Sequence, residues 1–431
     1  QKQVQQINQN IKGGSDLDYV CCWFVKAADY IQNTNIKVAF VSTNSITQGE
    51  QAILLWKELL QNKNTKIIFA HRTFKWTIDE KKAKGMRVAS VFVVIIGFSV
   101  KEGAQKYLFE YETLVSDPVK IEVKNISQYL TNNPAIFISG RRQHIQGNFV
   151  PKLVFGNMPN DGGHLIFTKK EKTDFLHMEP GAEKYIRPFL GSEEFINNSP
   201  RYCLWLRGAE PNELKKLPLV MERIEKVRKK RLGSTRSATQ KLAYTPALFG
   251  EIRQPKNRYL VIPEVSSENR NYIPIGFLDS NVIPSNKLYT IDGGGLYEFG
   301  VLTSMIHMDW MRHVGGRLKS DYQYSNGIVY NNFPWPEPSD RDKEDISAKA
   351  QAVLDAREQF PHSSLADLYD PNTMPPALLK AHLALDRAVD KAYRKVAFKD
   401  EKERIEFLFE LYQKLVSPLI ESENKRGRKK A

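Results

Sequence analysis

The stretch AFVSTNSITQGEQ, residues 39–51, decides the fold, because an apolar run stops at Ser, Thr and Asn and a helical apolar pattern follows. This arrangement is typical of a strand, a turn and a helix. A second apolar run, KIIFA at 66–70, ends on the basic and aromatic segment HRTFKW at 71–76. A third, RVASVFVVIIGF at 87–98, has the near-continuous apolar character of a strand buried on both faces. The pattern predicts an open α/β sheet, whose ligands bind at the carboxyl ends of its strands.

The composition bounds the domain count and the partner. With 431 residues the chain is too long for one ordinary domain, and two or three are expected. Its net charge of +14 favours a polyanionic partner. Cys21, Cys22 and Cys203 have neither disulfide-framework nor zinc spacing, so we expect no metal and a reducing cytoplasm. No apolar run reaches the about 18 residues of a membrane-spanning helix, and no signal peptide opens the chain, so no membrane partner is expected.

Turn-rich sequence between 122 and 200 predicts a domain boundary near residues 125–135. An amphipathic helix is predicted before it, at 18–30, and further elements follow it. These are helices at 214–230, 296–314, 341–359, 375–395 and 400–417, and strands at 259–262, 272–277 and 287–291.

Nine segments, spread over nearly the whole chain, resemble the later motifs of the MmeI-like (type IIL) single-chain restriction-modification enzymes. They are LDYVCCWFVKAADYI, VAFVSTNSITQGEQAILLW, IIFAHRTFKW, ASVFVVIIGF, AEKYIRPFLGSEEFIN, RYCLWL, LPLVMERIEKVRKKR, FGEIRQPKNRYLVIPEVSSENRNYIPIGF and GRLKSDYQYSNGIVYNNFPWP. In that family one polypeptide carries a nuclease, a helical spacer, an adenine-N6 methyltransferase that uses S-adenosylmethionine, and a target-recognition domain.

The resemblance implies an architecture in three parts. Residues 1–125 are expected to form the carboxyl-terminal half of the methyltransferase domain, with a partial Rossmann-like α/β sheet. Residues 126–336 are expected to form a mixed α+β target-recognition domain, and residues 337–431 a helical tail. The implied partner is double-stranded DNA, and the implied cofactor is S-adenosylmethionine. Whether the parent enzyme also cleaves DNA, and its oligomeric state, stay open.

Two motifs of the family's methyltransferase are missing from this sequence. No Asn-Pro-Pro occurs, since Asn133-Pro134 lacks the second proline, and we expect Gly293–Gly295 to lack the preceding strand that a cofactor loop requires. Because the chain also begins at Gln1, we expect a carboxyl-terminal fragment that does not methylate DNA alone. The alternative is a non-catalytic DNA-binding specificity module that acts with a separate catalytic chain. An RNA-binding structural protein would explain the charge but not the buried sheet.

Phe74 ends the strand before the last hairpin of the predicted sheet. An enzyme that modifies a base in a duplex extrudes it and stacks it on an aromatic ring, and the resemblance implies this role for Phe74. The sequence pattern alone favours another interpretation, in which Phe74 and Trp76 alternate along a half-buried strand, and for Trp76 we keep that interpretation.

Polar residues near the same strand ends have two interpretations each. Ser42, Thr43 and Asn44 either bind substrate or cap the following helix. His71 and Arg72 are candidates to neutralise a phosphate near the extruded base, although single histidines are more often structural.

Lys319 and Asp321 are two residues apart, and so would lie on one side of an extended segment. Such a pair can read a G·C base pair, because Lys donates to guanine O6 and N7 while Asp accepts from cytosine N4. The resemblance implies that the residue pair at this position reads one base pair of the target. The alternative is an ordinary surface salt bridge.

Other polar loop residues are weaker candidates. Further base-reading residues are predicted at Glu264, Asn286 and Lys287, against the alternative of solvated loop positions. Phosphate contacts, which set register without reading sequence, are predicted at Arg141, Arg142, Arg253, Lys256, Arg258, Arg270 and Arg317. The run Arg228-Lys229-Lys230-Arg231 fits equally a phosphate contact or a solvated helix end that complements the helix dipole.

Overall fold

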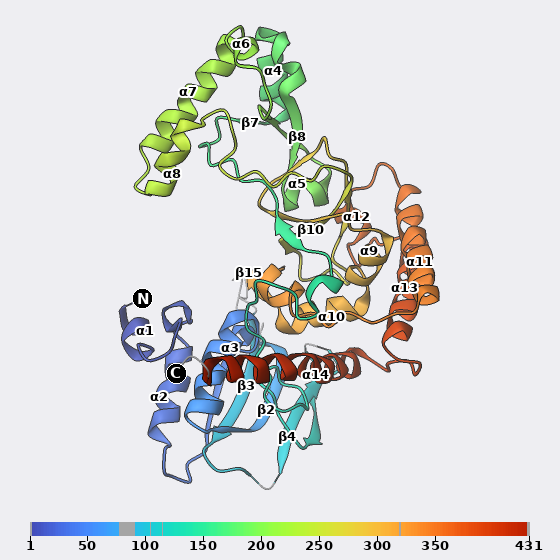
Figure 1. Ribbon diagram of the computed structural model, residues 1–431. Coiled ribbons are helices and arrows are strands. Elements are labelled where there is room, and N and C mark those ends of the chain that lie inside the picture. Colours follow the sequence, from blue (N-terminus) through green and yellow to red (C-terminus); the bar gives the residue numbers. More distant parts are fainter. Residues whose placement is uncertain (1, 77–90, 104, 114, 319, 429–431) are drawn as a thin grey trace, which may run out of the picture. The chain divides into compact units, whose positions relative to one another are not determined.

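The computed structural model describes residues 2–76, 91–103, 105–113, 115–318 and 320–428, with side chains as far as residue 418. These residues form two compact units that are interleaved in the sequence, and Figure 1 shows their elements. Unit 1 contains residues 1–146, 309–334 and 398–431, and unit 2 contains residues 147–308 and 335–397.

The compact units do not coincide with three consecutive domains. The chain leaves unit 1 after Gln146, returns at Asp309, leaves again after Pro334 and returns at Phe398. Part of the predicted target-recognition segment and part of the predicted tail therefore fold together with the predicted methyltransferase segment. The boundaries at 125 and 336 stay a prediction.

Unit 1 is built on one mixed sheet. Its strands are β1 (Val38–Thr43), β2 (Lys66–Trp76), β3 (Val91–Ser99), β4 (Lys106–Tyr111) and β5 (Pro118–Val123), in the order β1-β3-β2-β4-β5. Strand β3 is antiparallel to both β1 and β2, while β2 and β4 are parallel. Strands β1 and β2 consequently run in the same direction, and their carboxyl ends lie at one edge of the sheet. The predicted α/β class is confirmed.

Aromatic residues hold two helices on this sheet. Phe24 of α2 (Cys21–Tyr30) packs on Phe40 of β1 and Phe98 of β3, with ring centroids 5.0 and 5.8 Å apart. Trp56 of α3 (Gly49–Lys57) lies 5.9 Å from the same ring and donates its Nε1–H to the carbonyl of Ile46. Burial of such large rings is the main source of stability here, and it fixes the loop that connects β1 to α3.

A second cluster in unit 1 joins its later segments. Trp310 of α10 (Met305–Val314) packs on Phe409 and Tyr412 of α14 (Glu401–Arg428), and Phe409 also stacks on Tyr129. The remaining elements of the unit are α1 (Lys2–Ile7), η1 (Gly14–Asp16), η2 (Asn44–Thr47), η3 (Glu58–Asn62), β15 (Gly316–Leu318), β16 (Asp321–Gln323) and η7 (Asn326–Tyr330).

Unit 2 contains two four-stranded sheets, in the orders β12-β10-β14-β6 and β13-β8-β9-β7. Its strands are β6 (Leu153–Phe155), β7 (Ile166–Phe167), β8 (Ile186–Leu190), β9 (Arg201–Leu204), β10 (Tyr259–Pro263), β11 (Val265–Ser266), β12 (Gly276–Leu278), β13 (Ile283–Pro284) and β14 (Leu288–Asp292). Its helical elements are η4 (Gly147–Phe149), α4 (Lys169–Met178), η5 (Pro180–Tyr185), α5 (Ser192–Asn197), α6 (Pro211–Leu214), α7 (Pro218–Leu232), α8 (Ser237–Lys241), η6 (Leu242–Tyr244), α9 (Leu296–Leu302), α11 (Asp340–Glu358), α12 (Leu365–Leu368) and α13 (Pro376–Tyr393), and α10 begins here.

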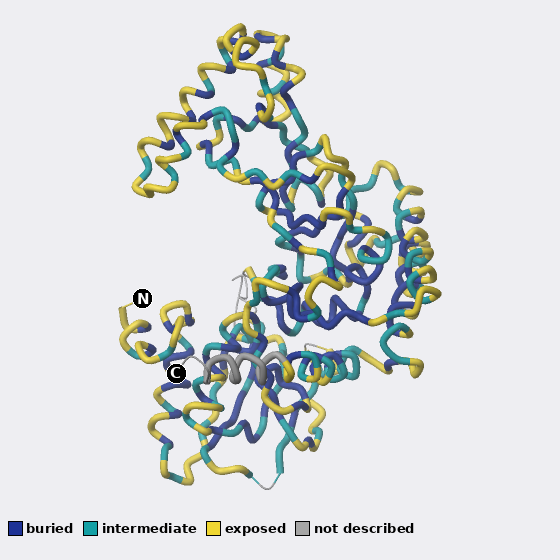
Figure 2. The backbone as a smooth tube through the Cα atoms, viewed as in Figure 1, coloured by how far each residue is buried: buried dark blue, intermediate teal, exposed yellow. Residues whose placement is uncertain are grey.

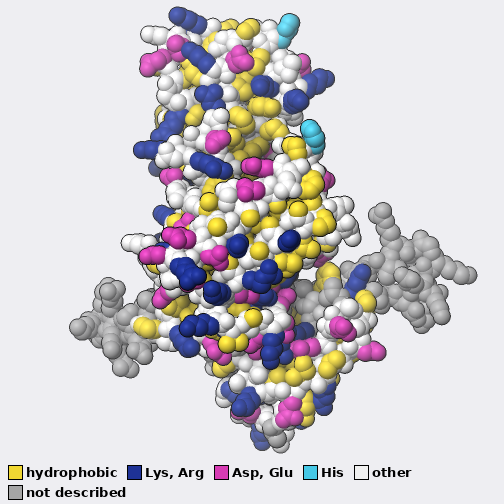
Figure 3. All heavy atoms as spheres, turned by 90° about the vertical axis from the view of Figure 1, so that its right-hand side faces the viewer, with side chains coloured by type: hydrophobic (Ala, Val, Ile, Leu, Met, Phe, Trp, Pro, Cys, Tyr) yellow, Lys and Arg dark blue, Asp and Glu magenta, His cyan; other side chains and the backbone are white. Residues whose placement is uncertain are grey.

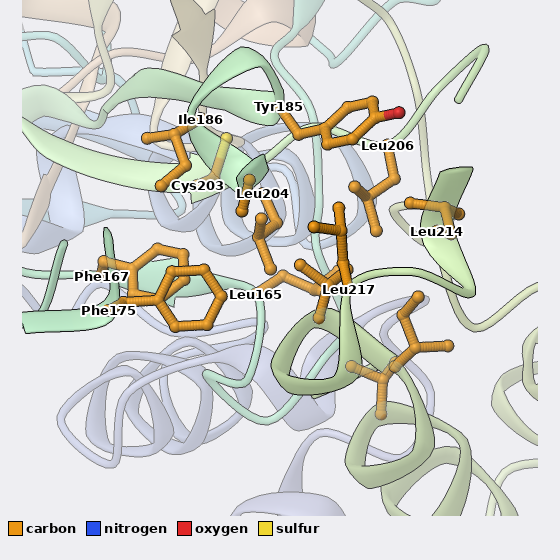
Figure 4. Packing of buried hydrophobic residues seen from close by; sticks show 14 of the residues in the cluster. Leu165, Phe167, Phe175, Tyr185, Ile186, Cys203, Leu204, Leu206, Leu214 and Leu217 are labelled. Atoms are coloured by element: carbon orange, nitrogen blue, oxygen red, sulfur yellow. The ribbon is translucent and has the colours of Figure 1, made fainter. Parts of the chain in front are cut away.

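An apolar cluster stabilises the second sheet of unit 2 (Figure 4). Phe167 of β7 packs on Phe175 of α4 at 5.0 Å between ring centroids, and Leu204 of β9 belongs to the same cluster. Helix α7 contributes Val220 and Ile224 to it, and buried and exposed residues alternate along this helix at helical spacing (Figure 2). Within the described residues, no helix is both long enough and apolar enough to cross a membrane.

The sequence pattern misplaced two elements. The predicted helix at 296–314 is wrong as one helix, because α9 ends at Leu302 and α10 begins at Met305. Ser304 Oγ donates to the carbonyl of Val301, and the Met305 N–H bonds Asp386 instead of continuing α9. The predicted strand at 272–277 survives only as β12 from Gly276, since Pro274 has no N–H for a ladder.

Arg231, at the end of α7, overturns both interpretations made for it from the sequence. Its side chain is 0% exposed, so it neither contacts phosphate nor lies in solvent. Its guanidinium donates five hydrogen bonds of 2.7–3.0 Å to main-chain carbonyls, those of Pro159, Asn160, Leu242, Thr245 and Leu248. Arg231 therefore ties two loops to α7.

Candidate nucleic-acid interface

The polar residues at the carboxyl end of β1 and just after it do not cap the following helix. Ser42 is buried, and its Oγ donates to the carbonyl of Thr43 at 3.1 Å. Thr43 Oγ1 lies 2.9 Å from Ser45 Oγ, within the same loop. The N-cap of α3 is Gln48, which makes no side-chain cap. Of the two interpretations for this loop, helix capping is excluded, and Asn44 faces a pocket instead.

Strand β2 contains a β-bulge just before Phe74. In the pairing with β3, His71 opposes Ile95 and Phe74 opposes Val93, so β2 has one extra residue between them. A bulge re-aims the side chains that follow it. Phe74 is only partly buried, and its ring stacks on Tyr111 with centroids 4.9 Å apart. Phe74 is therefore not a core residue, and it lies near the carboxyl end of β2, which continues to Trp76.

His71 and Arg72 are both engaged within the protein. The His71 ring lies flat on Phe109, with centroids 4.1 Å apart, and its Nδ1 is 2.8 Å from the Tyr111 hydroxyl. Burial lowers the pKa of His71, which makes it a poor cation at neutral pH. Arg72 donates from Nε to the carbonyl of Leu130 and pairs with Glu110 at 3.5 Å. The geometry favours a structural role for His71.

A pocket of about 760 Å³ opens beside these residues, entirely within unit 1. This volume lies in the range of about 300–1,000 Å³ typical of small-molecule sites. Its lining combines three parts of the sequence and includes Asn44, Thr73, Tyr111, Arg312, Arg317 and Lys402. Phe74 does not line the pocket. Thr73 does, and so does Tyr111, on which the Phe74 ring stacks.

The segment that carries Asp321 is the tip of a hairpin. In the antiparallel pair β15–β16, Leu318 opposes Asp321 and Arg317 opposes Tyr322. Two residues separate the paired strands, and the placement of Lys319 and Asp321 on one side of an extended segment stays a prediction. Lys319 lies outside the described residues. Asp321 is partly exposed at the start of β16, and a two-residue hairpin is narrow enough to enter a DNA groove.

Charged residues surround the base of this hairpin. The Arg317 guanidinium lies 3.9 Å above the Tyr322 ring, and its Nη1 donates to the carbonyl of Ser320. Arg312 hydrogen-bonds the side chain of Tyr322. Burial opposes the charge of Arg312, yet Glu401 and Tyr322 more than compensate and raise its pKa. Arg317, predicted as a phosphate contact, is thus folded back on its own hairpin.

Two of the further base-reading candidates form an ion pair in unit 2. Lys287 Nζ lies 2.9 Å from Glu264 Oε2, and the Glu264 N–H also bonds the carbonyl of Lys287. Asn286, next to Lys287, is partly buried. The structure brings the three predicted residues together, but an ion pair between two of them leaves fewer free groups for a base edge.

The predicted phosphate contacts differ in availability. Arg142, Lys256 and Arg258 are exposed, although Arg258 also lies 4.7 Å from the Phe277 ring centroid. The others bond within their own units: Arg141 to Asn332, Arg253 to Gly156 and Glu251, and Arg270 to Ser266. On the face in Figure 3, basic and acidic side chains are interspersed. Net charge alone therefore does not locate the partner.

Gly293–Gly295 does follow a strand, contrary to the sequence prediction. It joins β14 to α9 in an antiparallel sheet of unit 2. The Gly295 N–H already bonds the Glu298 carboxylate at 2.8 Å, which closes the helix start and would repel an anionic ligand. The loop is not a cofactor cradle. In the described part of the chain, no three His, Cys, Asp or Glu side chains are grouped as metal ligands.

Sequence reasoning missed the residues that support the hairpin. Asp309 has a fully buried side chain and contacts Arg312 at 3.0 Å and Arg404 at 3.4 Å. Glu401 pairs with Arg312 at 3.3 Å. The spacing of Asp309 and Arg312 on one helix is a recognisable signal, but nothing in the sequence connects them to Arg404, which is 95 positions away.

Three family models match consecutive parts of the chain. They describe the MmeI DNA-methyltransferase domain at residues 1–110, the MmeI target recognition domain at 132–337 and the MmeI C-terminal domain at 338–420. A solved structure of the Type IIL restriction-modification enzyme MmeI in complex with DNA is 49% identical, with a TM-score of 0.85. The chain belongs to the MmeI family. The match covers 96% of this chain and 55% of that one.

The chain is also similar to a curated protein, DNA methyltransferase A of Bacillus subtilis (strain 168), with 46% identity over 406 residues. The match covers 94% of this chain and 44% of the relative, so the chain spans about half the length of the proteins it matches. The hairpin β15–β16 lies in the segment that matches the MmeI target recognition domain. It nevertheless folds within unit 1, together with the segment that matches the methyltransferase domain.

Proposed function

We propose that this protein recognises a specific sequence in duplex DNA and methylates the N6 amino group of an adenine within it, using S-adenosylmethionine. One observation carries the proposal: within unit 1, the hairpin of the target-recognition match packs with the strand edge of the methyltransferase match around a single pocket. A protein that both recognises and modifies DNA must hold its base-reading residues at a fixed distance from the residues that receive the modified base. The relatives, named as a DNA methyltransferase and as a DNA-bound restriction-modification enzyme, support it.

In this proposal Phe74 stacks on the extruded adenine. A base in a duplex must leave the helix before its amino group can be reached. Phe74 is partly exposed at the carboxyl edge of the sheet, and Tyr111 supports one side of its ring. The pocket is lined by Thr73, the neighbour of Phe74 in sequence, and by Tyr111, on which the Phe74 ring stacks.

Recognition is assigned to the hairpin tip and to loops of unit 2. Asp321, with Lys319, is proposed to read one G·C pair, and Glu264, Asn286 and Lys287 to contact other bases. The exposed Arg142, Lys256 and Arg258 are proposed as phosphate contacts, which set register and affinity.

The cofactor rests on the family alone. S-adenosylmethionine would supply an activated methyl group, but the Gly293–Gly295 loop is closed by Glu298, and the sequence has neither a Gly-rich cofactor loop after a parallel strand nor Asn-Pro-Pro. No residue of this chain is therefore proposed to bind the cofactor. The lack of these motifs also supports the second candidate function, a specificity module that acts with a separate catalytic chain. Cleavage of DNA by the complete encoded protein is a further proposal.

We expect the 431-residue chain to bind duplex DNA in a salt-dependent manner and to transfer no methyl group. Phosphate neutralisation releases counterions, so affinity should fall about tenfold or more between roughly 50 and 200 mM salt. Fluorescence anisotropy with a labelled duplex measures binding, and transfer of a labelled methyl group measures activity. Methylation by the purified chain would contradict the expectation that a chain without the Asn-Pro-Pro motif is inactive, and salt-independent binding would contradict phosphate contacts.

Phe74→Ala in the complete protein encoded by the gene should lower the methylation rate about 10- to 100-fold while DNA affinity changes little. The reason is that stacking, worth about 1–3 kcal/mol per base, stabilises the extruded base and not the initial complex. Single-turnover methylation and anisotropy separate the two effects. Trp76→Ala is the matched control, an exposed aromatic residue on the same strand, and should change the rate less. If Phe74→Ala lowered the affinity and the methylation rate equally, the Phe74 side chain would have only a structural role.

A further inference from the structure

The hairpin β15–β16 approaches helix α3 at main-chain distance. A Cβ atom built on Gly49, the first residue of α3, would lie 3.1 Å from Gly316 Cα. Gly49 also has φ of +56°, a conformation that favours glycine. A side chain at this position would push against the main chain of the hairpin, which cannot rotate away as a flexible side chain would. Gly49 therefore sets how closely the hairpin sits on α3.

A second contact fixes the hairpin from within unit 1. Tyr322 is only 6% exposed and lies between two arginines, with Arg317 above its ring and Arg312 bonded to its side chain. Tyr322 follows Asp321 directly and belongs to the same strand, β16. Any shift of Tyr322 is consequently passed to Asp321 at the tip.

Arg312 is itself held in place. It pairs with Asp309, whose side chain is fully buried, and with Glu401 at the start of α14. Arg404, also on α14, bonds the other oxygen of Asp309. A buried carboxylate shared by two guanidiniums has little freedom, because each of its two oxygens is held by a different arginine. The arginine that contacts Tyr322 is thus a rigid support.

We propose that Gly49, Arg312 and Tyr322 form a seat that holds the hairpin tip at a fixed distance from the base-extrusion site, and that this seat makes the reading of one base pair accurate. The inference rests on the proposed function. These three are positioning residues, since none of them is assigned to touch a base. Gly49 begins α3 directly after the segment that follows β1, so one side of the seat belongs to the same sheet that carries Phe74.

The consequence is that damage to the seat should affect one position of the target. If the hairpin tip moves while the other base-reading residues keep their positions, discrimination falls at the base pair read by Asp321. Discrimination at the other positions of the target is unchanged. A misplacement of about 1 Å is enough to cost up to 10²-fold in rate, so small substitutions suffice. General destabilisation would instead lower activity on all sites equally.

The test uses the complete encoded protein with two seat variants, Gly49→Ala and Tyr322→Phe. Methylation rates are measured on the cognate duplex and on duplexes with each alternative at every position of the motif. We expect discrimination at one base pair to fall about tenfold in both variants, because a displaced Asp321 then distinguishes the matched base pair less well from a mismatch. Discrimination at the other positions, and the DNA affinity of Tyr322→Phe, should stay unchanged.

The control for Gly49→Ala is Gly147→Ala. Gly147 has a similar φ of +62° but no atom within 4 Å of the added Cβ, so it reproduces the backbone strain without the close approach. Melting temperature is measured for all variants. Unchanged discrimination at every position in both seat variants, with or without a lower melting temperature, would overturn the seat. A wild-type protein that methylates no DNA would instead overturn the proposed function.

Discussion

Replacing Lys319 by Glu and Asp321 by Arg together is expected to change the preferred base pair at one target position from G·C to C·G. The double variant reverses the order of donor and acceptor that the hairpin offers to the groove. A guanidinium then meets guanine on the opposite strand, and Glu accepts from cytosine. Each mismatch costs about 1–3 kcal/mol, so the ratio of the two preferences should change by roughly 10²-fold or more.

The structure supports this prediction through Asp321. It lies at the start of β16, partly exposed, at the tip of a hairpin with a two-residue turn. Either single replacement should mostly inactivate the protein, because an unmatched charge would face a base edge. The measurement is the methylated motif, read by sequencing DNA from cells that express each variant.

A reversed surface ion pair serves as the control. Glu222 and Lys226 on α7 form an exposed pair at 2.7 Å, and Glu222→Lys with Lys226→Glu should leave the motif unchanged. If the hairpin variant also keeps its original motif at normal activity, Lys319 and Asp321 are a surface pair without a role in recognition.

Arg231→Met should destabilise unit 2 by about 3–5 kcal/mol, the usual cost of breaking a buried charged network. The methionine fills similar space but removes the Arg231 donor from five carbonyls. Those of Pro159, Leu242 and Thr245 keep a main-chain donor, and the others lose the donor that Arg231 supplied. The loops at 159–160 and 242–248 would then lose their common attachment to α7. Arg231→Lys keeps the charge without the planar fork and should give an intermediate loss.

Hydrogen exchange of peptides from residues 159–249 measures this effect locally, which matters because the chain has two units. Lys229→Met on the same helix is the control, and as an exposed position it should change stability by less than about 0.5 kcal/mol. Equal protection in Arg231→Met and Lys229→Met would show that the five bonds contribute little to the stability of the folded unit.

Several features were predictable because they depend on neighbours in the sequence. The apolar runs at 39–41 and 66–70 lie in β1 and β2, and the described part of the run at 87–98 lies in β3. The helices at 341–359 and 375–395 were predicted to within two residues of their ends. Alternation and helical spacing report which side of an element is buried, and burial of that side is what drives its formation. The break between α9 and α10 was missed because it depends on Asp386, distant in sequence.

The sequence by itself determined the family, the α/β class, and the aromatic and polar candidates at the strand ends. It did not determine that residues 309–334 and 398–431 fold with the first 146 residues. Consequently it could not show that Arg404 and Arg312 share Asp309, that Gly49 meets Gly316, or that Arg231 is buried. Such contacts join residues far apart in the chain, and only the tertiary packing of both units brings charges to a common partner or removes one from water.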